Sequence, residues 1–460
     1  MVEEKKLEFR FGAVGKYIPV LVAIIFILIA GTHQSNVNGY CLAFFAAVVI
    51  SAPFAKDLNA YGNAAIGGLG RSIFAVISVA VILAAVSGKL VSSSGLISSL
   101  AYLVIHSGMS GGVFAAISFL ICCLLSMSTG TSVGTNVVSF PILFPIGVLA
   151  GANPAVMAGA LVSGALFGDN LAPISDTTIA SANTQEATMG GVVRTRIWYS
   201  IPAAVLTFLT ILIFGGSGSS AAAATDLTFN AKSMLMLLVP AVVITCCLLK
   251  QHLLVSLAFG ILVGILVGVI SGLYGIQDIF GFPGGWTVDG IFINAITGTV
   301  GTVFMLYGVF MLLGIMQASG VIADISALLS KLARGKRSTE VITGLSVGVM
   351  GWITGVTAVG MVAMGDVIRT LGEKFGVNKY RRANLMDCGG LCLTALAPWT
   401  VHAVLPASLA NGNADVALTP LSIVTHNYYC IILVVIMILA IITGYGAKNN
   451  PDAKNEEPSK

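Results

Sequence analysis

The sequence has very few charged residues. Only 9% of its 460 residues are Asp, Glu, Lys or Arg, against roughly 25% in soluble domains. Hydrophobic residues make up 57% of the chain, and the mean hydropathy is +0.96. The net charge of +4 comes from Lys and Arg scattered over short connections, a pattern that gives no basic patch for nucleic acid. This composition excludes an ordinary soluble domain and argues against a nucleic-acid-binding protein.

Two further signals are missing. Most of the eight cysteines lie inside apolar stretches, and no pair has the spacing of a zinc finger, so we expect neither a disulfide framework nor a cysteine metal site. The apolar stretch after Lys16 has no small-residue cleavage site, so we interpret it as a first membrane span rather than a cleaved signal peptide.

Long apolar runs recur along the whole chain. About 20 apolar residues are needed to cross a bilayer as a helix. Runs near that length occupy 17–31, 72–88, 197–214, 233–249, 253–272 and 427–445. The sequence therefore predicts an all-α polytopic membrane protein, which we expect to be multi-pass in the cell inner (plasma) membrane.

The chain also matches itself. Residues 129–178 align without gaps on 354–403 at a constant offset of 225 residues. The shared residues are mainly Gly, Pro and small hydroxyl types, such as Thr129-Gly130 on Thr354-Gly355 and Leu171-Ala172-Pro173 on Leu396-Ala397-Pro398. Gly and Pro interrupt helices. We therefore predict two repeats, each with a re-entrant or hairpin segment and a broken transmembrane helix.

The repeat divides the chain into two halves. We place the first half at 1–214, with its core motif at 112–181. A Gly-, Ser- and Ala-rich linker follows at 215–232. The second half then occupies 233–446, with its core motif at 337–410, and 447–460 form a cytoplasmic tail.

Charge at equivalent connections predicts that the two copies are inverted. Basic residues before the first span place the N-terminus in the cytoplasm, and we expect the C-terminus there too. The connection 150–155 is uncharged, whereas its partner 373–382 carries several Lys and Arg residues. The short segment 95–106 lacks Lys and Arg, whereas its partner 320–331 ends in Lys331. Inverted repeats allow alternating access to a site near the bilayer midplane.

The first copy concentrates polar residues in two segments, SMSTGTSVGTN at 126–136 and GALFGDNLAPISDTTIAS at 164–181. A carboxylate at bilayer depth costs about 3 kcal/mol on insertion scales, so Asp169 and Asp176 indicate function. We predict that both are sodium ligands. The wider cation or substrate site includes Thr129, Gly130, Thr131, Asn170, Ser175 and Thr177. A structural alternative for Asp176 is to cap the helix that follows the break.

The second copy is less acidic. It adds Thr354, Gly355, Asp387 and Thr400 to the predicted site. Asp387 could carry a proton, contribute to the ion site, or pair with Arg381 or Arg382. His402 either titrates near neutral pH or is a satisfied core residue, so the candidate proton carriers are Asp169, Asp387 and His402. Arg194 and Arg196 are interpreted as anchors at the cytoplasmic face.

The motif GALFGDNLAPISDTT resembles the signature of the NhaC-type sodium/proton antiporter family. The segment Thr129-Gly130-Thr131-Ser132 resembles that family's TGTS element, and Asp387-Cys388-Gly389-Gly390 with Pro398-Trp399 resembles its second element. The resemblance covers most of the chain and implies membership of the ion transporter superfamily. It further implies inverted repeats with re-entrant hairpins, whose tips would be Thr129-Gly130 and Thr354-Gly355.

Two departures from that pattern keep the cargo open. Ala172 stands where the family usually has Ser, and 183–190 lack the family's Asp-His pair. We rank sodium/proton antiport first and sodium-coupled symport or exchange of a small organic solute, an amino acid or carboxylate, second. An intramembrane hydrolase is disfavoured because no nucleophile elbow is present. We expect sodium as transported or coupling ion, no cofactor, and protons and membrane lipid as partners. A homodimer stays open.

Overall fold

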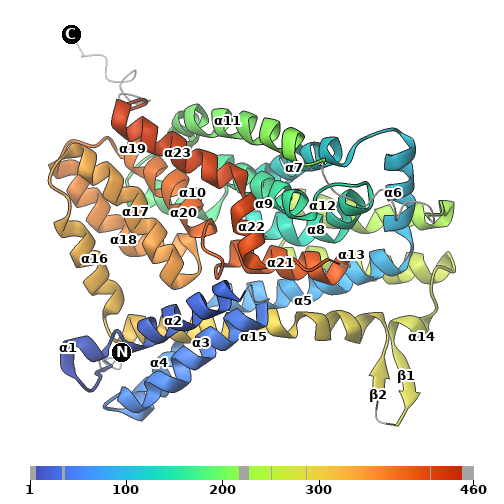
Figure 1. The fold of residues 1–460 in the computed structure, drawn as a ribbon, viewed down its shortest axis with the longest axis horizontal. Helices are drawn as coiled ribbons and strands as arrows, with labels where there is room; N and C mark the ends of the chain where they lie inside the picture. The colour runs from blue at the N-terminus through green and yellow to red at the C-terminus, as the bar shows by residue number, and fades with distance from the viewer. Residues whose placement is uncertain are drawn as a thin grey trace.

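Figure 1 shows the computed structural model of the chain, which describes residues 7–33, 37–216, 227–249, 251–285, 287–414 and 416–447. Most of the expected linker 215–232 and nearly all of the expected tail 447–460 lie outside these residues. Within them, ten helical segments are long and apolar enough to cross a membrane, or eleven if α22 and α23, bent by 50°, form one span. The all-α polytopic fold expected from the sequence is confirmed.

The N-terminal part contains six α-helices and one short 3₁₀ helix. They are α1 (Gly12–Gly15), α2 (Ile18–Thr32), α3 (Val37–Ser51), η1 (Ala52–Phe54), α4 (Leu58–Leu69), α5 (Ser72–Ser93) and α6 (Leu96–His106). The 11 residues of α6 are too few to cross a bilayer, as expected for the short segment 95–106.

The first motif region forms a helical hairpin and a broken helix. The hairpin consists of α7 (Gly111–Thr129) and α8 (Ser132–Leu149). The broken helix consists of α9 (Pro154–Leu171) and α10 (Asp176–Thr184), and α11 (Met189–Phe214) follows. The start predicted for this last span, residue 197, was wrong, because two arginines interrupt the apolar run within a helix that is already formed.

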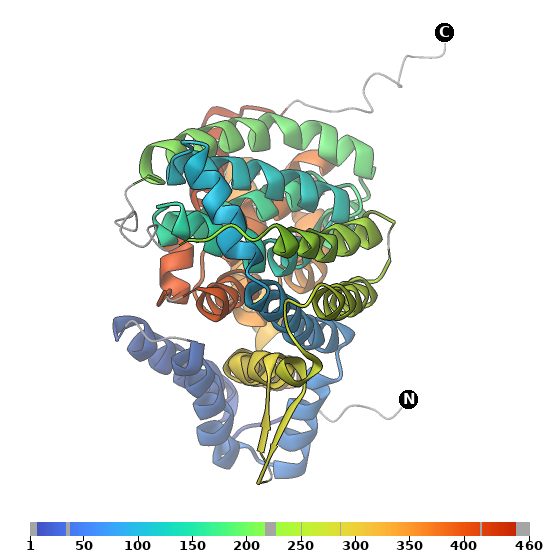
Figure 2. The same ribbon diagram turned by 90° about the vertical axis from the view of Figure 1, so that its right-hand side faces the viewer.

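The middle of the chain supplies further apolar helices and a small hairpin of strands. Its elements are η3 (Ala231–Leu237), α12 (Leu238–Leu248), α13 (Leu253–Ile270), α14 (Ile276–Ile279), β1 (Gly281–Gly284), β2 (Thr287–Asp289) and α15 (Ile291–Ala318). The strands β1 and β2 pair antiparallel. In Figure 2, α15 lies between the N-terminal helices and the rest of the bundle. It packs against α3, α4 and α5, so the two halves share an interface along this helix.

The second motif region repeats the arrangement of the first. It contains α16 (Val321–Lys331), α17 (Lys336–Thr354), α18 (Thr357–Lys374), α19 (Lys379–Asn384), the π-helix η4 (Leu385–Leu391), α20 (Cys392–Ala395), α21 (Val401–Asn413), α22 (Pro420–His426) and α23 (Tyr428–Thr443). The bounds of α6, α7 and α8 recur in α16, α17 and α18 at an offset of 225 residues. The breaks after α9 and α20 also end at equivalent residues, because α10 and α21 begin at the same offset.

The repeated elements lie toward different ends of the long axis. In Figure 1, α6 lies at the end that carries the β1–β2 hairpin, and α16 lies at the end that carries α1. The hairpin α17–α18 is likewise displaced toward the α1 end. Its helices carry charged residues near their ends, including Lys336, Glu340 and Lys374, which explains why they are less apolar than α7 and α8.

Candidate functional site

Each helical hairpin turns at a glycine. Gly130, between α7 and α8, has φ 69°, and Gly355, between α17 and α18, has φ 70°. Side chains with a Cβ rarely adopt this left-handed conformation. At the first tip, Thr131 caps α8 by accepting a hydrogen bond from the backbone N–H of Gly134 at 3.3 Å. At the second, the hydroxyl of Thr354 donates to the carbonyl of Val356 at 2.9 Å. The breakers expected from the repeat therefore form two similar tight turns.

The two helix breaks are also alike. After α9 the backbone N–H of Ser175 donates to the carbonyl of Ala172 at 3.3 Å, and after α20 the N–H of Thr400 donates to the carbonyl of Ala397 at 3.2 Å. Each break contains a proline, which cannot donate a backbone hydrogen bond. Helix ends leave carbonyl and N–H groups without partners inside the helix, so both breaks bring backbone polar groups into the core.

Close packing of α9 on α7 positions the first break. A Cβ on Gly164 would lie 2.3 Å from the carbonyl oxygen of Phe119, and one on Gly168 would lie 2.4 Å from that of Cys123. Only glycine permits this approach of two helix backbones, a common device in membrane helix pairs. Asp169 follows directly and is thereby held against the hairpin tip.

A small cavity lies where both tips and both breaks meet. We call it the carboxylate cavity. Its volume is about 50 Å³, enough for roughly four water positions at 10–15 Å³ each. Its lining comes from seven elements and their connections and consists of Ile77, Thr131, Ser132, Val133, Asp169, Asp176, Thr177, Val356, Thr357, Ala358, Leu391, Val401 and His402.

Asp169 is held by hydrogen bonds to neutral groups. It is only 3% exposed. Its Oδ2 accepts from the backbone N–H of Ser132 at 3.2 Å, and its Oδ1 accepts from the Ser175 hydroxyl at 2.5 Å. The Ser175 hydroxyl also lies 3.0 Å from that of Thr177. No ion pair in the described part of the chain includes Asp169, so its charge is offset by dipoles alone.

Asp176 begins α10 and lines the same cavity. Its side chain is exposed, and its Oδ1 accepts from the backbone N–H of Thr177 at 2.9 Å. The capping alternative is not supported, because the residue before α10 is Ser175 and neither side chain makes a capping bond to a later turn. The described ion pairs do not include Asp176 either. The cavity thus combines two carboxylates with no cation beside them.

Two polar atoms of the cavity wall lack partners. The hydroxyl of Thr357 and Nδ1 of His402 are buried and make no hydrogen bond to any residue that the structure describes. Buried polar groups are normally satisfied, and an orphaned one calls for an occupant of the site. These atoms come from the second copy, whereas the carboxylates come from the first, so an occupant would contact both halves.

Asp387 has a partner that the sequence interpretation missed. The expected pairing with Arg381 or Arg382 is wrong: Arg381 Nε lies 3.2 Å from Glu340, and Arg382 donates to Gln185. Asp387 instead pairs with Arg196, whose Nη1 lies 2.7 Å from Asp387 Oδ2.

The surroundings of Arg196 correct its predicted role as a surface anchor. It is fully buried within α11. Its Nη1 donates to the Thr178 hydroxyl at 2.8 Å and to the carbonyl of Asn170, and its Nε donates to Asn384 at 3.2 Å. Burial of an arginine requires such partners, and the long α11 carries the side chain past the membrane face into the core.

The remaining predicted residues surround the cavity without lining it. Asn170 Nδ2 donates to Tyr429 at 3.1 Å, and the Thr400 hydroxyl donates to the carbonyl of Ala397 at 3.0 Å. Ser132 and Thr357 were left out of the predicted site although both line the cavity. They are equivalent at the offset of 225, and that equivalence is the signal that could have found them.

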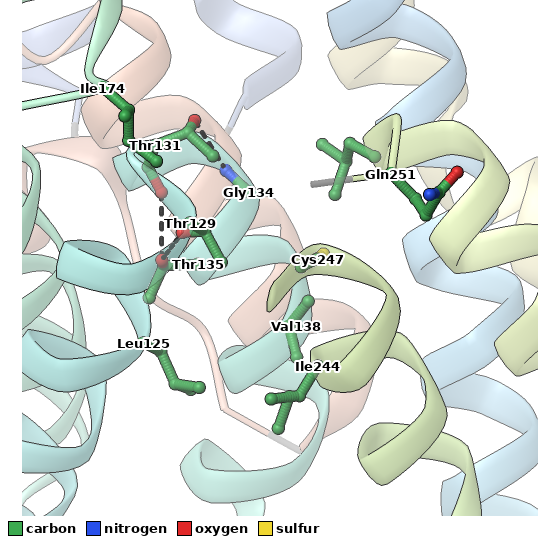
Figure 3. Close-up of a pocket in the computed structure, with 11 residues that line it drawn as sticks. Leu125, Thr129, Thr131, Gly134, Thr135, Val138, Ile174, Ile244, Cys247 and Gln251 are labelled. Atoms are coloured by element: carbon green, nitrogen blue, oxygen red, sulfur yellow. Dashed lines mark hydrogen bonds between the residues drawn. The ribbon is translucent and has the colours of Figure 1, made fainter. Parts of the chain in front are cut away.

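A larger cavity adjoins the first hairpin tip. We call it the tip cavity. It has a volume of about 260 Å³ and is lined by Thr129, Thr131 and Thr135 on one side and by residues of α12 and the following turn on the other (Figure 3). Thr131 lines both cavities.

The family profile described as Na+/H+ antiporter family matches residues 12–218 and 183–442. The chain belongs to this family. A protein of Alkalihalophilus pseudofirmus named Na(+)/H(+) antiporter NhaC is 27% identical over 321 residues, which cover 64% of this chain and 68% of that protein. The protein of the same name from Bacillus subtilis is 26% identical over 313 residues, covering 62% and 68%.

A third relative carries a different name. The Malate-2H(+)/Na(+)-lactate antiporter of Bacillus subtilis is 31% identical over 160 residues, which cover 35% of this chain and 33% of that protein. Membership of the Na+/H+ antiporter family confirms the NhaC-type resemblance and makes the chain a multi-pass membrane transporter rather than an enzyme. Sodium fits this family as a transported ion.

Proposed function

We propose that the chain exchanges sodium for protons across the membrane, with the carboxylate cavity as its cation site. The observation that carries the proposal is the placement of Asp169 and Asp176. Both line one small cavity between the two hairpin tips, and neither is part of a described ion pair. Among the described residues no cluster of three or more His, Cys, Asp or Glu exists, so the site lacks the ligand set of a transition-metal centre. Carboxylate, hydroxyl and carbonyl oxygens suit a hard cation.

Protons and sodium would use the same charge. Either one neutralises a carboxylate that is otherwise buried at bilayer depth. Asp169 is the first candidate for this exchange because it is buried and bound only by neutral donors. Asp387 and His402 are secondary proton carriers in the proposal. Asp387 already has Arg196 as its counter-ion, so it would change protonation only if that pair opens.

Alternating access would follow from inversion of the two copies. The recurrence of helix bounds at 225 residues and the placement of α6 and α16 at opposite ends support it (Figure 1). The α1 end of the molecule also carries the end of α23, so we propose that both termini lie on one side, the cytoplasmic face of the plasma membrane. Exposed apolar residues of α13, including Leu262, Leu266 and Ile270, would contact lipid. A homodimer stays a prediction.

Flux measurements in proteoliposomes test this function. An outward sodium gradient should drive protons inward, and a pH gradient should drive sodium uptake, in a saturable manner. Asp169→Asn should abolish both movements, because the amide keeps the shape of the side chain but removes its charge. Sodium movement that is never accompanied by protons in the wild-type protein would rule out the exchange.

A second candidate function is sodium-coupled symport or exchange of a small organic solute. The malate/lactate relative at 31% identity favours it, as does Ala172, which removes a hydroxyl from the first break. A coupled solute would raise the affinity for sodium by the same factor by which sodium raises the affinity for the solute. Binding measured with small carboxylates and amino acids separates this candidate from antiport, which predicts no such coupling.

A further inference from the structure

The tip cavity has one polar wall and one mostly apolar wall. The hydroxyls of Thr129 and Thr135 lie 3.3 Å apart, and the Thr135 hydroxyl donates to the carbonyl of Thr131 at 2.9 Å. Figure 3 shows these threonines on one side and Ile244, Cys247 and Gln251 on the other. The facing wall belongs to α12 and the turn before α13. This part of the chain is not used by the cation site proposed above.

A single turn of backbone separates this cavity from the carboxylates. Thr131 lines both cavities. Ile174 also lines the tip cavity, and the next residue, Ser175, donates its hydroxyl to Asp169. Ile174 packs directly on the hairpin tip, since a Cβ added to Gly130 would lie 2.7 Å from its Cγ1. A cation in the tip cavity would therefore need to pass only Thr131 and Ile174 to reach Asp169.

The lining chemistry suits an ion that still carries water. No Asp, Glu, Lys or Arg lines the cavity. Three threonine hydroxyls and the Gln251 amide offer neutral oxygens, which can replace part of a hydration shell without holding an ion tightly. Weak, sequential sites allow an ion to enter and to leave again. At ~10–15 Å³ per water position, the volume of about 260 Å³ accommodates an ion with its first hydration shell.

We propose that the tip cavity is a weak binding site for hydrated sodium and the entry chamber of the carboxylate cavity. The ion would lose part of its water against Thr129, Thr131 and Thr135 and then pass the first hairpin tip. This assignment rests on the proposed function, because it concerns the route by which the transported ion reaches Asp169. It adds α12 and the α12–α13 turn to the transport path.

Neighbouring cysteines of α12 allow a matched test. Cys247 lines the cavity and Cys246 does not, although both are partly buried. The third partly buried cysteine is Cys41, and the other five are buried. The double variants C41S/C246S and C41S/C247S therefore leave one reactive thiol each. Both are reconstituted and treated from each side with a small, membrane-impermeant, positively charged methanethiosulfonate, and sodium uptake is compared before and after treatment.

We expect the reagent to modify Cys247 in C41S/C246S and to lower sodium uptake at least about tenfold, because a fixed positive charge in the cavity repels the entering cation. Modification of Cys246 in C41S/C247S should change uptake less than about twofold, because that side chain lies outside the cavity and any repulsion is screened.

Three outcomes would overturn the inference. In the first, Cys247 is modified and sodium uptake does not change, so the cavity is off the path. In the second, only a lipophilic maleimide reaches Cys247, so the cavity holds a lipid chain. In the third, neither reagent reaches it. Sodium-driven proton movement in the untreated variants tests the proposed function separately. If that movement is present while Cys247 modification has no effect, only the entry chamber is refuted.

Discussion

Arg196 of α11 and Asp387 of η4 form an ion pair in which both side chains are 0% exposed and Nη1 lies 2.7 Å from Oδ2. The two residues come from different halves of the chain. The same Nη1 donates to Thr178 in α10, so the pair ties the first broken helix to the second. It also sets Asp387 apart from Asp169, which has no charged partner within the described residues.

Loss of one charge of this pair should destabilise the protein strongly. Arg196→Gln leaves Asp387 buried without a counter-ion, at a cost of about 3–5 kcal/mol. The double variant Arg196→Gln/Asp387→Asn removes both charges and should recover most of that loss. Thermal unfolding in detergent measures the effect. As a control, Arg369→Gln breaks an exposed pair with Glu186 and should cost no more than about 1 kcal/mol. Equal destabilisation by Arg196→Gln and Arg369→Gln would refute the role of the buried pair.

The two hairpin glycines should respond differently to alanine. Both have positive φ, so each substitution strains the backbone by roughly 1–2 kcal/mol. At Gly130 the new Cβ would also lie 2.7 Å from Ile174, whereas at Gly355 the nearest atom is Val309 Cγ1 at 3.1 Å. We expect Gly130→Ala to reduce sodium transport more than Gly355→Ala. Uptake assays on equal amounts of folded protein decide this, and the reverse order would contradict the placement of Ile174 on the first tip.

Removal of the Thr357 hydroxyl should weaken sodium binding without unfolding the protein. That hydroxyl lines the carboxylate cavity and has no described hydrogen-bond partner. Loss of one neutral ligand should lower sodium affinity about tenfold, or ~1.4 kcal/mol, in Thr357→Val. Thr343→Val is the matched control, because the Thr343 hydroxyl is buried but donates to the carbonyl of Thr339 in its own helix. Sodium titration of both variants is the measurement, and similar affinities in the two would exclude Thr357 from the ion site.

Acidification should weaken sodium binding. A proton on Asp169 or Asp176 removes the negative charge that attracts the ion, so the apparent sodium affinity falls as pH falls, by up to about tenfold per pH unit for competition with one proton. Equilibrium sodium titrations across a pH series test this sign. A sodium affinity that is constant over the whole series would be incompatible with a shared site for the two ions.

The sequence predicted those parts of the site that depend on local backbone chemistry. Gly130, Gly355 and the two proline-containing breaks are recognisable because few residues besides glycine tolerate positive φ and because proline ends a helix. The carboxylates Asp169 and Asp176 were recognisable because unpaired acids are rare at bilayer depth.

Other parts of the site depend on how distant helices are rotated against one another. Arg196 lies at the polar start of an apolar run, where a surface anchor is the simpler interpretation, and its contact with Asp387 spans 191 positions of the chain. Equally, no local pattern indicates that Cys247 faces the first hairpin tip. Ser132 and Thr357 could have been found by requiring both copies of the repeat to contribute equivalent side chains.

Sodium binding to Asp169→Asn is the most direct test of the central claim, that the carboxylate cavity holds the transported cation. Isothermal titration of the purified protein with sodium would be compared for wild type, Asp169→Asn and Asp366→Asn. Asp366 has a side chain that is 94% exposed and pairs only with the i+3 neighbour Arg369, so it controls for the loss of one carboxylate. We predict wild-type affinity in Asp366→Asn and no measurable sodium binding in Asp169→Asn, with both variants folded. Undiminished sodium binding in Asp169→Asn would contradict the account and place the cation site elsewhere.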